Sequence, residues 1–122
     1  MTSALVEQLE RQAARQTLDG VMDNFQLDNA DLAAALQVDR RTIQRYRNED
    51  TLPTRKVRER LARLREISIL LEEVFRTSEG AITWLYTPVP LLEGRRPIDL
   101  MRRGKLDEVI TALETYQSGA FV

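Results

Sequence analysis

The sequence of 122 residues contains no cysteine and no histidine. These absences exclude a disulfide scaffold, the usual structural zinc sites and the catalytic triads that depend on either residue. No apolar run approaches the roughly 18–20 residues that span a bilayer, and the opening Met-Thr-Ser-Ala-Leu-Val lacks the pattern of a signal peptide. We therefore expect a cytoplasmic protein that makes no membrane contact and binds no metal or cofactor.

The carboxylate pairs of the sequence do not suit acid–base catalysis. Glu72-Glu73 and Asp107-Glu108 are adjacent in sequence, so on a helix their side chains diverge instead of converging on one substrate. With histidine and cysteine also absent, the sequence predicts a protein that is not an enzyme.

The net charge of −1 conceals a strongly uneven distribution. Residues 1–39 carry two basic and seven acidic residues, residues 40–65 carry ten basic and three acidic, and residues 66–122 carry six basic and nine acidic. A basic segment inside an acidic chain is typical of a phosphate-binding surface, although a solvated charged face is the plainer alternative.

The stretch LAAALQVDRRTIQRY, from Leu32 to Tyr46, predicts two short helices joined by a turn. Leu32 and Leu36 share one face of the first helix, Val38 lies in the turn, and Ile43 and Tyr46 share one face of the second. Packing of these five side chains would set the angle between the helices. The pattern is that of a helix-turn-helix, whose second helix reads the major groove.

The second of these helices is rich in arginine on the face opposite Ile43. Gln37 stands where this motif most often has glycine, a substitution that a left-handed turn tolerates at modest strain. We expect Asp39 to cap the helix. The predicted contacts with operator DNA are base readout by Arg40, Arg41, Thr42, Gln44 and Arg45, and phosphate binding by Arg47, Arg55, Lys56 and Arg58.

Helices are also predicted on both sides of this motif. Ser3 can cap a first helix to about Leu18, followed by a break near Gly20 and Asn24, and Asp28 can cap the first helix of the motif. The longest helix runs from a Thr54 cap to about Arg76, with a buried stripe of Val57, Leu61, Leu64, Ser68, Leu71 and Phe75. Its second half is apolar nearly all round, so it must be covered by the C-terminal segment or by a second subunit.

The C-terminal segment changes character after Glu79. A short helix carries the single tryptophan, Trp84, which we expect to pack in the core. Pro88 and Pro90 force an extended turn, and Gly94 suits a positive φ. Pro97 then starts a short helix to Met101 that Gly104 closes, and the last helix carries a stripe of Leu106, Val109, Ile110, Leu113 and Tyr116.

Three motifs of this segment occur in a recognisable order: Ala81-Ile82-x-Trp84-Leu85, then Pro90-Leu91-Leu92-Glu93-Gly94-Arg95-Arg96-Pro97-Ile98-Asp99-Leu100, then a terminal helix and Gly119-x-Phe121-Val122. In this order the segment resembles the toxin-binding domain of Xre-type antitoxins, the MbcA/ParS/Xre antitoxin family. The resemblance covers nearly the whole chain, because in that family a Cro/repressor-like helix-turn-helix precedes the toxin-binding domain.

The resemblance implies an all-α fold with a DNA-binding unit in residues 1–76 and a helical toxin-binding domain in residues 77–122. It further implies a partner, a RES-domain toxin that consumes NAD⁺, whose active-site opening the C-terminal tail blocks. The toxin contacts that it implies are Arg95, Arg96, Tyr116, Gln117, Gly119, Ala120, Phe121 and Val122. For Arg95 and Arg96 we favour a structural role, with Asp99 or its neighbours tying the loop.

Two functional hypotheses follow. The first is an antitoxin that occludes its toxin and represses its own operon, and the second is a stand-alone helix-turn-helix regulator whose C-terminal part is a dimerisation module. Recognition of paired half-sites requires two copies, so we expect a homodimer or a larger assembly with toxin. The candidate surfaces for self-association are the N-terminal helix and the apolar residues Ile67–Phe75.

Overall fold

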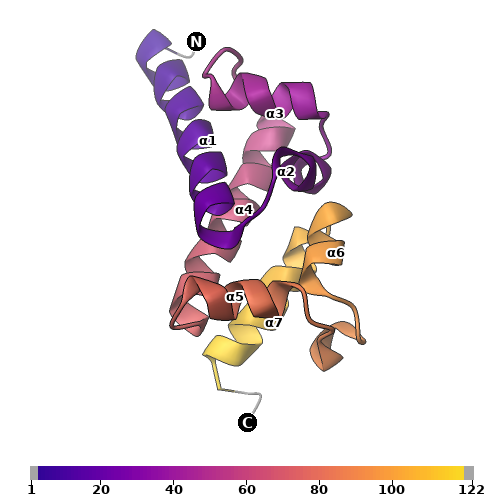
Figure 1. Cartoon of the computed structure of the whole chain (residues 1–122). Coiled ribbons are helices and arrows are strands. Elements are labelled where there is room, and N and C mark those ends of the chain that lie inside the picture. The colour runs from indigo at the N-terminus through magenta and orange to yellow at the C-terminus, as the bar shows by residue number, and fades with distance from the viewer. Residues whose placement is uncertain (1–2, 120–122) are drawn as a thin grey trace.

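Seven α-helices and one 3₁₀-helix make up the computed structural model, which describes residues 3–119 (Figure 1). No strand occurs in this range; two residues, Val89 and Arg95, form an isolated antiparallel bridge. The predicted all-α class is confirmed. In chain order the elements are α1 (Ala4–Phe25), α2 (Asn29–Leu36), α3 (Arg40–Arg47), α4 (Arg55–Val74), α5 (Ser78–Leu85), η1 (Pro90–Leu92), α6 (Pro97–Arg102) and α7 (Leu106–Gln117).

The first helix is longer than the sequence suggested. The break expected near Gly20 and Asn24 is wrong, because α1 continues without interruption to Phe25. Glycine in a helix interior costs about 1 kcal/mol relative to alanine. Burial of Leu18, Val21 and Phe25 on one side of α1 offsets that cost. The helix ends at Phe25, and the next residue, Gln26, takes the left-handed conformation.

The predicted N-caps are confirmed. The Asp28 carboxylate accepts a hydrogen bond from the backbone N–H three residues on at 2.8 Å, and Asp39 does the same at 2.7 Å. Thr54 caps α4 through its hydroxyl at 3.2 Å. Each cap satisfies an amide that the first helical turn leaves without a partner, so the starts of α2, α3 and α4 are encoded locally.

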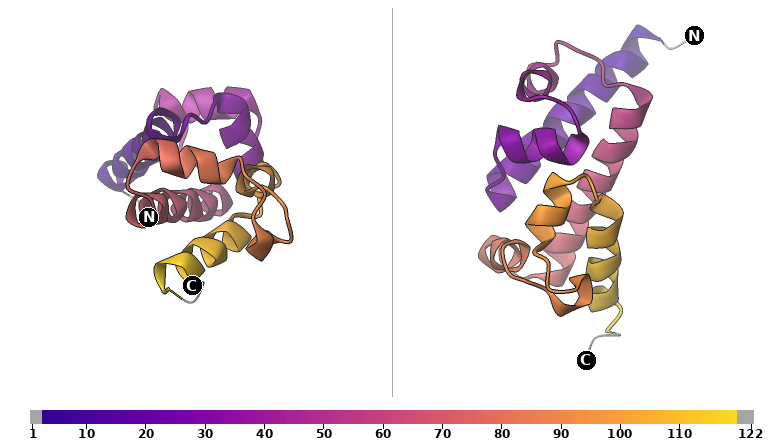
Figure 2. Two further views of the ribbon diagram at one scale, coloured as in Figure 1. Left: turned by 60° about the horizontal axis from the view of Figure 1, so that its bottom comes forward. Right: turned by 90° about the vertical axis from the view of Figure 1, so that its right-hand side faces the viewer.

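Helix α4 joins the two ends of the molecule, and α7 packs along its second half (Figure 2). Arg63 bonds Asp107 at 2.9 Å and Glu73 bonds Gln117. Both links span 44 residues, so α4 and α7 run parallel and in register. The C-terminal segment therefore covers much of the apolar half of α4. This is one of the two alternatives expected from the sequence, the other being cover by a second subunit.

The buried face of α4 differs from the predicted stripe. Ile67 and Leu70 are buried, whereas Ser68 is only half-buried, because α7 covers the side on which the first two lie. One large apolar side chain remains outside this packing: Ile69 is 46% exposed.

The core is continuous from one end of the molecule to the other. Helices α1–α3 pack around the first half of α4, and α5–α7 pack around its second half (Figure 1). Buried side chains of all seven α-helices belong to a single cluster. The two halves of the chain are therefore held in a defined orientation by shared side-chain packing.

Candidate nucleic-acid interface and partner-binding segment

The predicted helix-turn-helix is present in α2 and α3. Leu32, Leu36, Ile43 and Tyr46 are buried together, and Val38 packs against them from the turn. Gln37 takes the left-handed conformation with φ of 58°. A non-glycine residue thus occupies the turn position, as the sequence pattern implied.

Three arginines line the exposed face of α3. Arg40, Arg41 and Arg45 are exposed, and within residues 3–119 none of their guanidinium groups makes a hydrogen bond or an ion pair. Arginine can bind guanine through two parallel hydrogen bonds, and an unpaired guanidinium can do so without first breaking an internal bond.

Asp39 places a negative charge at the start of α3. Hydrogen bonds from Thr42 lower the pKa of the Asp39 carboxyl below its ordinary value, and the charges of Arg41 and Arg45 act in the same direction. The carboxylate therefore stays ionised at neutral pH, where it caps the helix and lies near these two arginines. Thr42 itself is half-buried.

Gln44 lies in a short chain of side-chain amides. Asn29 of α2 donates to Gln44 at 3.5 Å, and Gln44 donates to Asn48 at 3.2 Å. Asn29 also accepts a hydrogen bond from Arg47 at 3.2 Å. These contacts hold the Gln44 amide along the exposed face of α3.

The residues predicted to bind phosphate fall into two groups. Arg55 and Lys56 are exposed at the start of α4; the side chain of Arg55 is 88% exposed and lies 3.5 Å from Glu59, one turn further along the same helix. Arg47 instead bonds Asp19 of α1 at 2.8 Å, and Arg58 donates to the Pro53 carbonyl at 2.7 Å. Arg58 also lies 3.7 Å from Glu10.

Sequence reasoning missed these acidic partners on α1. The available signal was the excess of acidic residues in residues 1–39, which complements the basic segment that follows. Because both segments pack against one another, part of the basic charge serves the fold, and the remainder is exposed on α3 and at the start of α4.

Arginines of the C-terminal segment are bonded internally. Arg95 donates to the Leu92 carbonyl at 2.8 Å and to Glu108 at 3.1 Å. Arg96 forms a two-point contact with Asp99, at 2.8 and 2.9 Å, and this contact lowers the pKa of the Asp99 carboxyl. The geometry agrees with the structural role expected for this turn.

An ion pair that the sequence did not reveal connects the two halves of the chain. Asp31 of α2 is the one charged residue that is buried within residues 3–119. Its carboxylate accepts from the Asp28 backbone N–H at 3.1 Å and from Arg102 of α6 at 2.8 Å, across 71 residues of sequence. Hydrogen bonding with Asp31 raises the pKa of Arg102.

Tyr86 lies beside the ion pair between Asp31 and Arg102. The guanidinium groups of Arg96 and Arg102 lie 5.9 and 6.0 Å from the centre of its ring. Arg102 is also 3.6 Å from Asp99. Alternating charges thus run from the start of α2 across α6, which positions the helix-turn-helix relative to the C-terminal segment.

Aromatic rings cluster near the end of α7. Trp84 packs against Phe75, with ring centres 5.7 Å apart, and meets Tyr116 edge-on at 6.0 Å. Trp84 is half-buried and packs against the buried cluster, so it lies at the edge of the core in which we expected it. Among the implied toxin contacts, Tyr116 belongs to this cluster and Gln117 and Gly119 follow it, whereas Ala120, Phe121 and Val122 lie outside the described residues.

Comparison with known families decides the identity of this two-part arrangement. Residues 4–66 match the antitoxin Xre-like helix-turn-helix domain, and residues 70–119 match the antitoxin Xre/MbcA/ParS C-terminal toxin-binding domain. The chain belongs to the Xre/MbcA/ParS antitoxin family. The boundary between the two matches falls within α4, the helix that both halves of this antitoxin share.

Related proteins are similar to the antitoxin over most of its length. A protein of Mycobacterium tuberculosis named a "probable mycobacterial cidal antitoxin" is 32% identical over 114 residues, which is 93% of this chain and 96% of the relative. The mycobacterial cidal antitoxin MbcA of the same species is 26% identical over 106 residues, 87% of this chain and 93% of the relative.

A solved structure is also similar. A chain in the crystal structure of the M. tuberculosis MbcT-MbcA toxin-antitoxin complex superposes with a TM-score of 0.69 at 27% identity. The match covers 88% of this antitoxin and 96% of that chain. The fold described above is thus shared with a protein crystallised in a toxin–antitoxin complex.

Two further structural properties concern membrane-spanning helices and metal sites. None of the helices in the described range is both long and apolar enough to cross a membrane. No group of three or more carboxylate side chains within residues 3–119 is arranged to hold a metal ion.

Proposed function

We propose that this antitoxin binds a cognate RES-domain, NAD-consuming toxin and blocks its active site with the C-terminal segment. The observation that carries the proposal is the match of residues 70–119 to the toxin-binding domain, together with the similarity to a chain from a toxin–antitoxin complex. The RES class and the consumption of NAD follow from the sequence resemblance.

Removal of Gly119–Val122 tests this toxin-binding role. The buried core ends at Leu113, so the shortened chain keeps every core side chain and is expected to fold. Co-expression with the toxin should then fail to rescue growth, while circular dichroism shows unchanged helix content. A stand-alone regulator with a C-terminal dimerisation module would keep all its properties after this deletion.

The helix-turn-helix represses the antitoxin's own operon, in the cytoplasm, by reading operator DNA with α3. Support comes from the three unpaired arginines on its exposed face. Arg41→Ala should relax the preference for one base pair by about 1–3 kcal/mol, because a two-point contact with guanine is lost. Binding to a panel of operators with single base-pair changes measures this effect.

Arg47→Ala is the matched control, since Arg47 lies on the same helix but bonds Asp19. It should weaken binding to all operators by a similar factor, through misplacement of α3. Equal losses on every operator for both variants would contradict the assignment of Arg41 to base readout.

A further inference from the structure

We propose that two copies of this chain associate through the groove between α1 and α4, with their α4 helices crossing antiparallel about Ser68 and Ile69. The proposal rests on the proposed repressor function, since paired half-sites are read by paired copies. It assigns to self-association one specific surface, which leaves α3 exposed.

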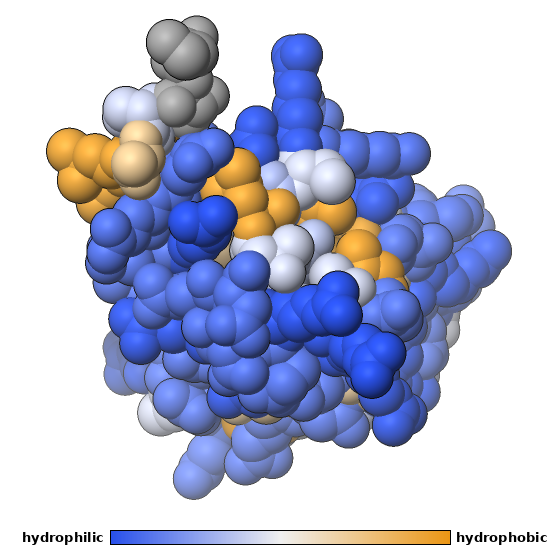
Figure 3. Space-filling view, turned by 90° about the horizontal axis from the view of Figure 1, so that it is seen from above, coloured by the Kyte–Doolittle hydropathy of each residue, from blue (hydrophilic) through white to orange (hydrophobic). Residues whose placement is uncertain are grey.

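Helix α1 has a second apolar face that the other described residues leave largely exposed. Leu5 is 66% exposed, Val6 43% and Leu9 54%. Figure 3, which looks onto the end that carries the N-terminus, shows a largely hydrophilic surface with hydrophobic residues beside the terminus and in a strip across the middle. Exposed apolar side chains that gather on one face of a helix are typical of an interaction site.

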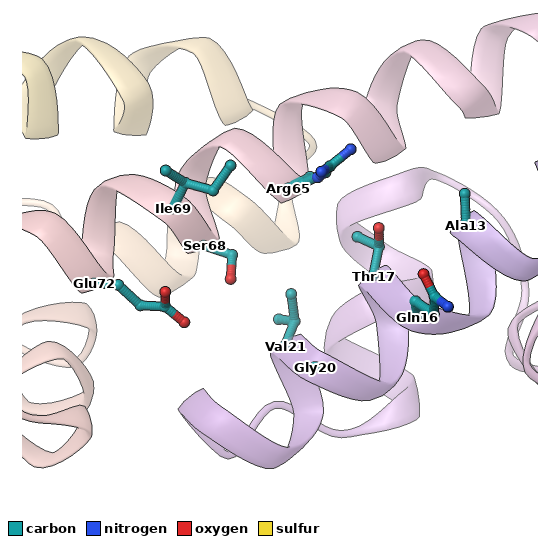
Figure 4. Close-up of a pocket in the computed structure, with 9 residues that line it drawn as sticks. All are labelled: Ala13, Gln16, Thr17, Gly20, Val21, Arg65, Ser68, Ile69 and Glu72. Carbon is teal, nitrogen blue, oxygen red and sulfur yellow. The ribbon is translucent and has the colours of Figure 1, made fainter.

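The groove continues this face along the molecule. Its volume is about 280 Å³, and small residues line it on both sides, among them Ala13 and Gly20 of α1 and Ser68 of α4. In Figure 4, Ser68 and Val21 lie opposite one another across the groove. Small side chains allow another helix to approach closely, and the exposed Ile69 provides an apolar contact at the crossing point.

The charges of the groove suit a second copy of this chain. Arg65 and Glu72 both line it, yet neither forms an ion pair within residues 3–119. They are seven positions apart, about 10.5 Å along the helix, and they do not pair with each other in the structure. Ser68 and Ile69 lie midway between them.

A two-fold axis through this midpoint satisfies both charges at once. In an antiparallel crossing, Arg65 of each copy faces Glu72 of the other copy, and this contact is made twice. Ile69 then packs against its own symmetry mate. Both charges of each pair, Arg65 and Glu72, are carried by one α4 helix. A two-fold interface between identical subunits requires a surface that is complementary to itself in this way.

The DNA-reading face lies on another side of α1. Arg15 and Asp19 of α1 form ion pairs with Glu49, in the loop after α3, and with Arg47, the last residue of α3. The groove residues Thr17 and Gly20 belong to a different face of α1. Association through the groove therefore leaves the three exposed arginines of α3 accessible.

A charge-swap experiment on the full chain tests the proposal. Arg65→Glu and Glu72→Arg should each weaken the dimer at least about tenfold, because like charges then face each other twice. The double variant should restore the dimer. Sedimentation velocity over a concentration series measures the dissociation constant, and circular dichroism verifies that each variant is folded.

Arg103→Glu is the matched control. Arg103 is exposed in the turn after α6 and makes no ion pair in the described part of the chain, so its reversal should leave the dimer unchanged. A monomeric wild-type chain, single variants that dimerise normally, or a double variant as monomeric as the single ones would overturn the proposal.

Toxin co-purification provides a separate readout. All of these variants should still co-purify with the toxin, since the implied toxin contacts lie in the C-terminal segment. Loss of toxin binding at an unchanged dimer constant would assign the groove to the toxin and overturn the proposal. Failure of the wild-type chain to bind any toxin would instead refute the proposed function and leave the dimer measurement valid.

Discussion

Arginine is used in opposite ways on the exposed face of α3, in the N-terminal half, and around α6, in the C-terminal half. On α3, Arg40 and Arg41 are exposed and form no hydrogen bond or ion pair with any described residue, whereas Arg95, Arg96 and Arg102 of the C-terminal segment are each bonded to a carboxylate. A paired guanidinium must lose its internal bond before it can bind a ligand. The comparison teaches that the pairing of the basic side chains, more than their number, distinguishes a nucleic-acid interface from a structural network.

The halves nevertheless share one core, which predicts that they unfold together. Leu32 of α2 and Leu113 of α7 are both fully buried in the same cluster. Leu32→Ala and Leu113→Ala should each lower the free energy of unfolding by about 2–5 kcal/mol. Urea unfolding should show a single transition for both variants. Two separate transitions would show that the halves are independent domains.

The turn between α6 and α7 tests how closely the halves meet. Gly104 has φ of +74°, and a Cβ atom there would lie 3.1 Å from Gln37 Cγ in the helix-turn-helix. Gly104→Ala should lower the free energy of unfolding by about 2 kcal/mol, from both backbone strain and this contact. Gly94, with φ of +79° and open space around it, is the control. Gly94→Ala should cost about 1 kcal/mol.

Truncation of one arginine in each half tests the comparison directly. Arg102→Ala should lower the free energy of unfolding by about 1–2 kcal/mol, because it leaves the buried Asp31 carboxylate without its charged partner. Arg41→Ala should change it by less than about 0.5 kcal/mol, since its exposed guanidinium forms no hydrogen bond or ion pair within residues 3–119. Similar losses in thermal or urea unfolding for both variants would remove the distinction between the two sets of arginines.

Low pH should destabilise both halves of the molecule. We expect this effect to be smaller than those of the substitutions described above. The pKa values of Asp39 on α3 and Asp99 on α6 are both lowered below the ordinary value of 3.8. Each carboxylate therefore contributes stability that is fully present above about pH 4 and is lost as the pH falls through the folded-state pKa. Asp39→Asn and Asp99→Asn should each flatten the decline in melting temperature between about pH 5 and pH 2. A decline identical to that of the wild type would contradict these roles.

Local features of the fold could be predicted from sequence because their causes lie within a few residues. Asp28, Asp39 and Thr54 cap helices through backbone groups three residues away. The helix-turn-helix spacing likewise depends on side chains within one short segment. The predicted break at Gly20 failed because burial of α1 against distant helices outweighs the weak local preference of glycine.

The sequence by itself determined the helical elements, their caps, the basic segment and the motifs that identify the family, because each of these depends on neighbours in the chain. Tertiary structure alone decided which basic side chains remain unpaired. Arg58 approaches Glu10 across 48 residues, and Arg102 reaches Asp31 across 71. Packing of α1 against α4 and of α6 against α2 brings these charges together. Electrostatic pairing depends on distance in space, which spacing along the chain does not encode.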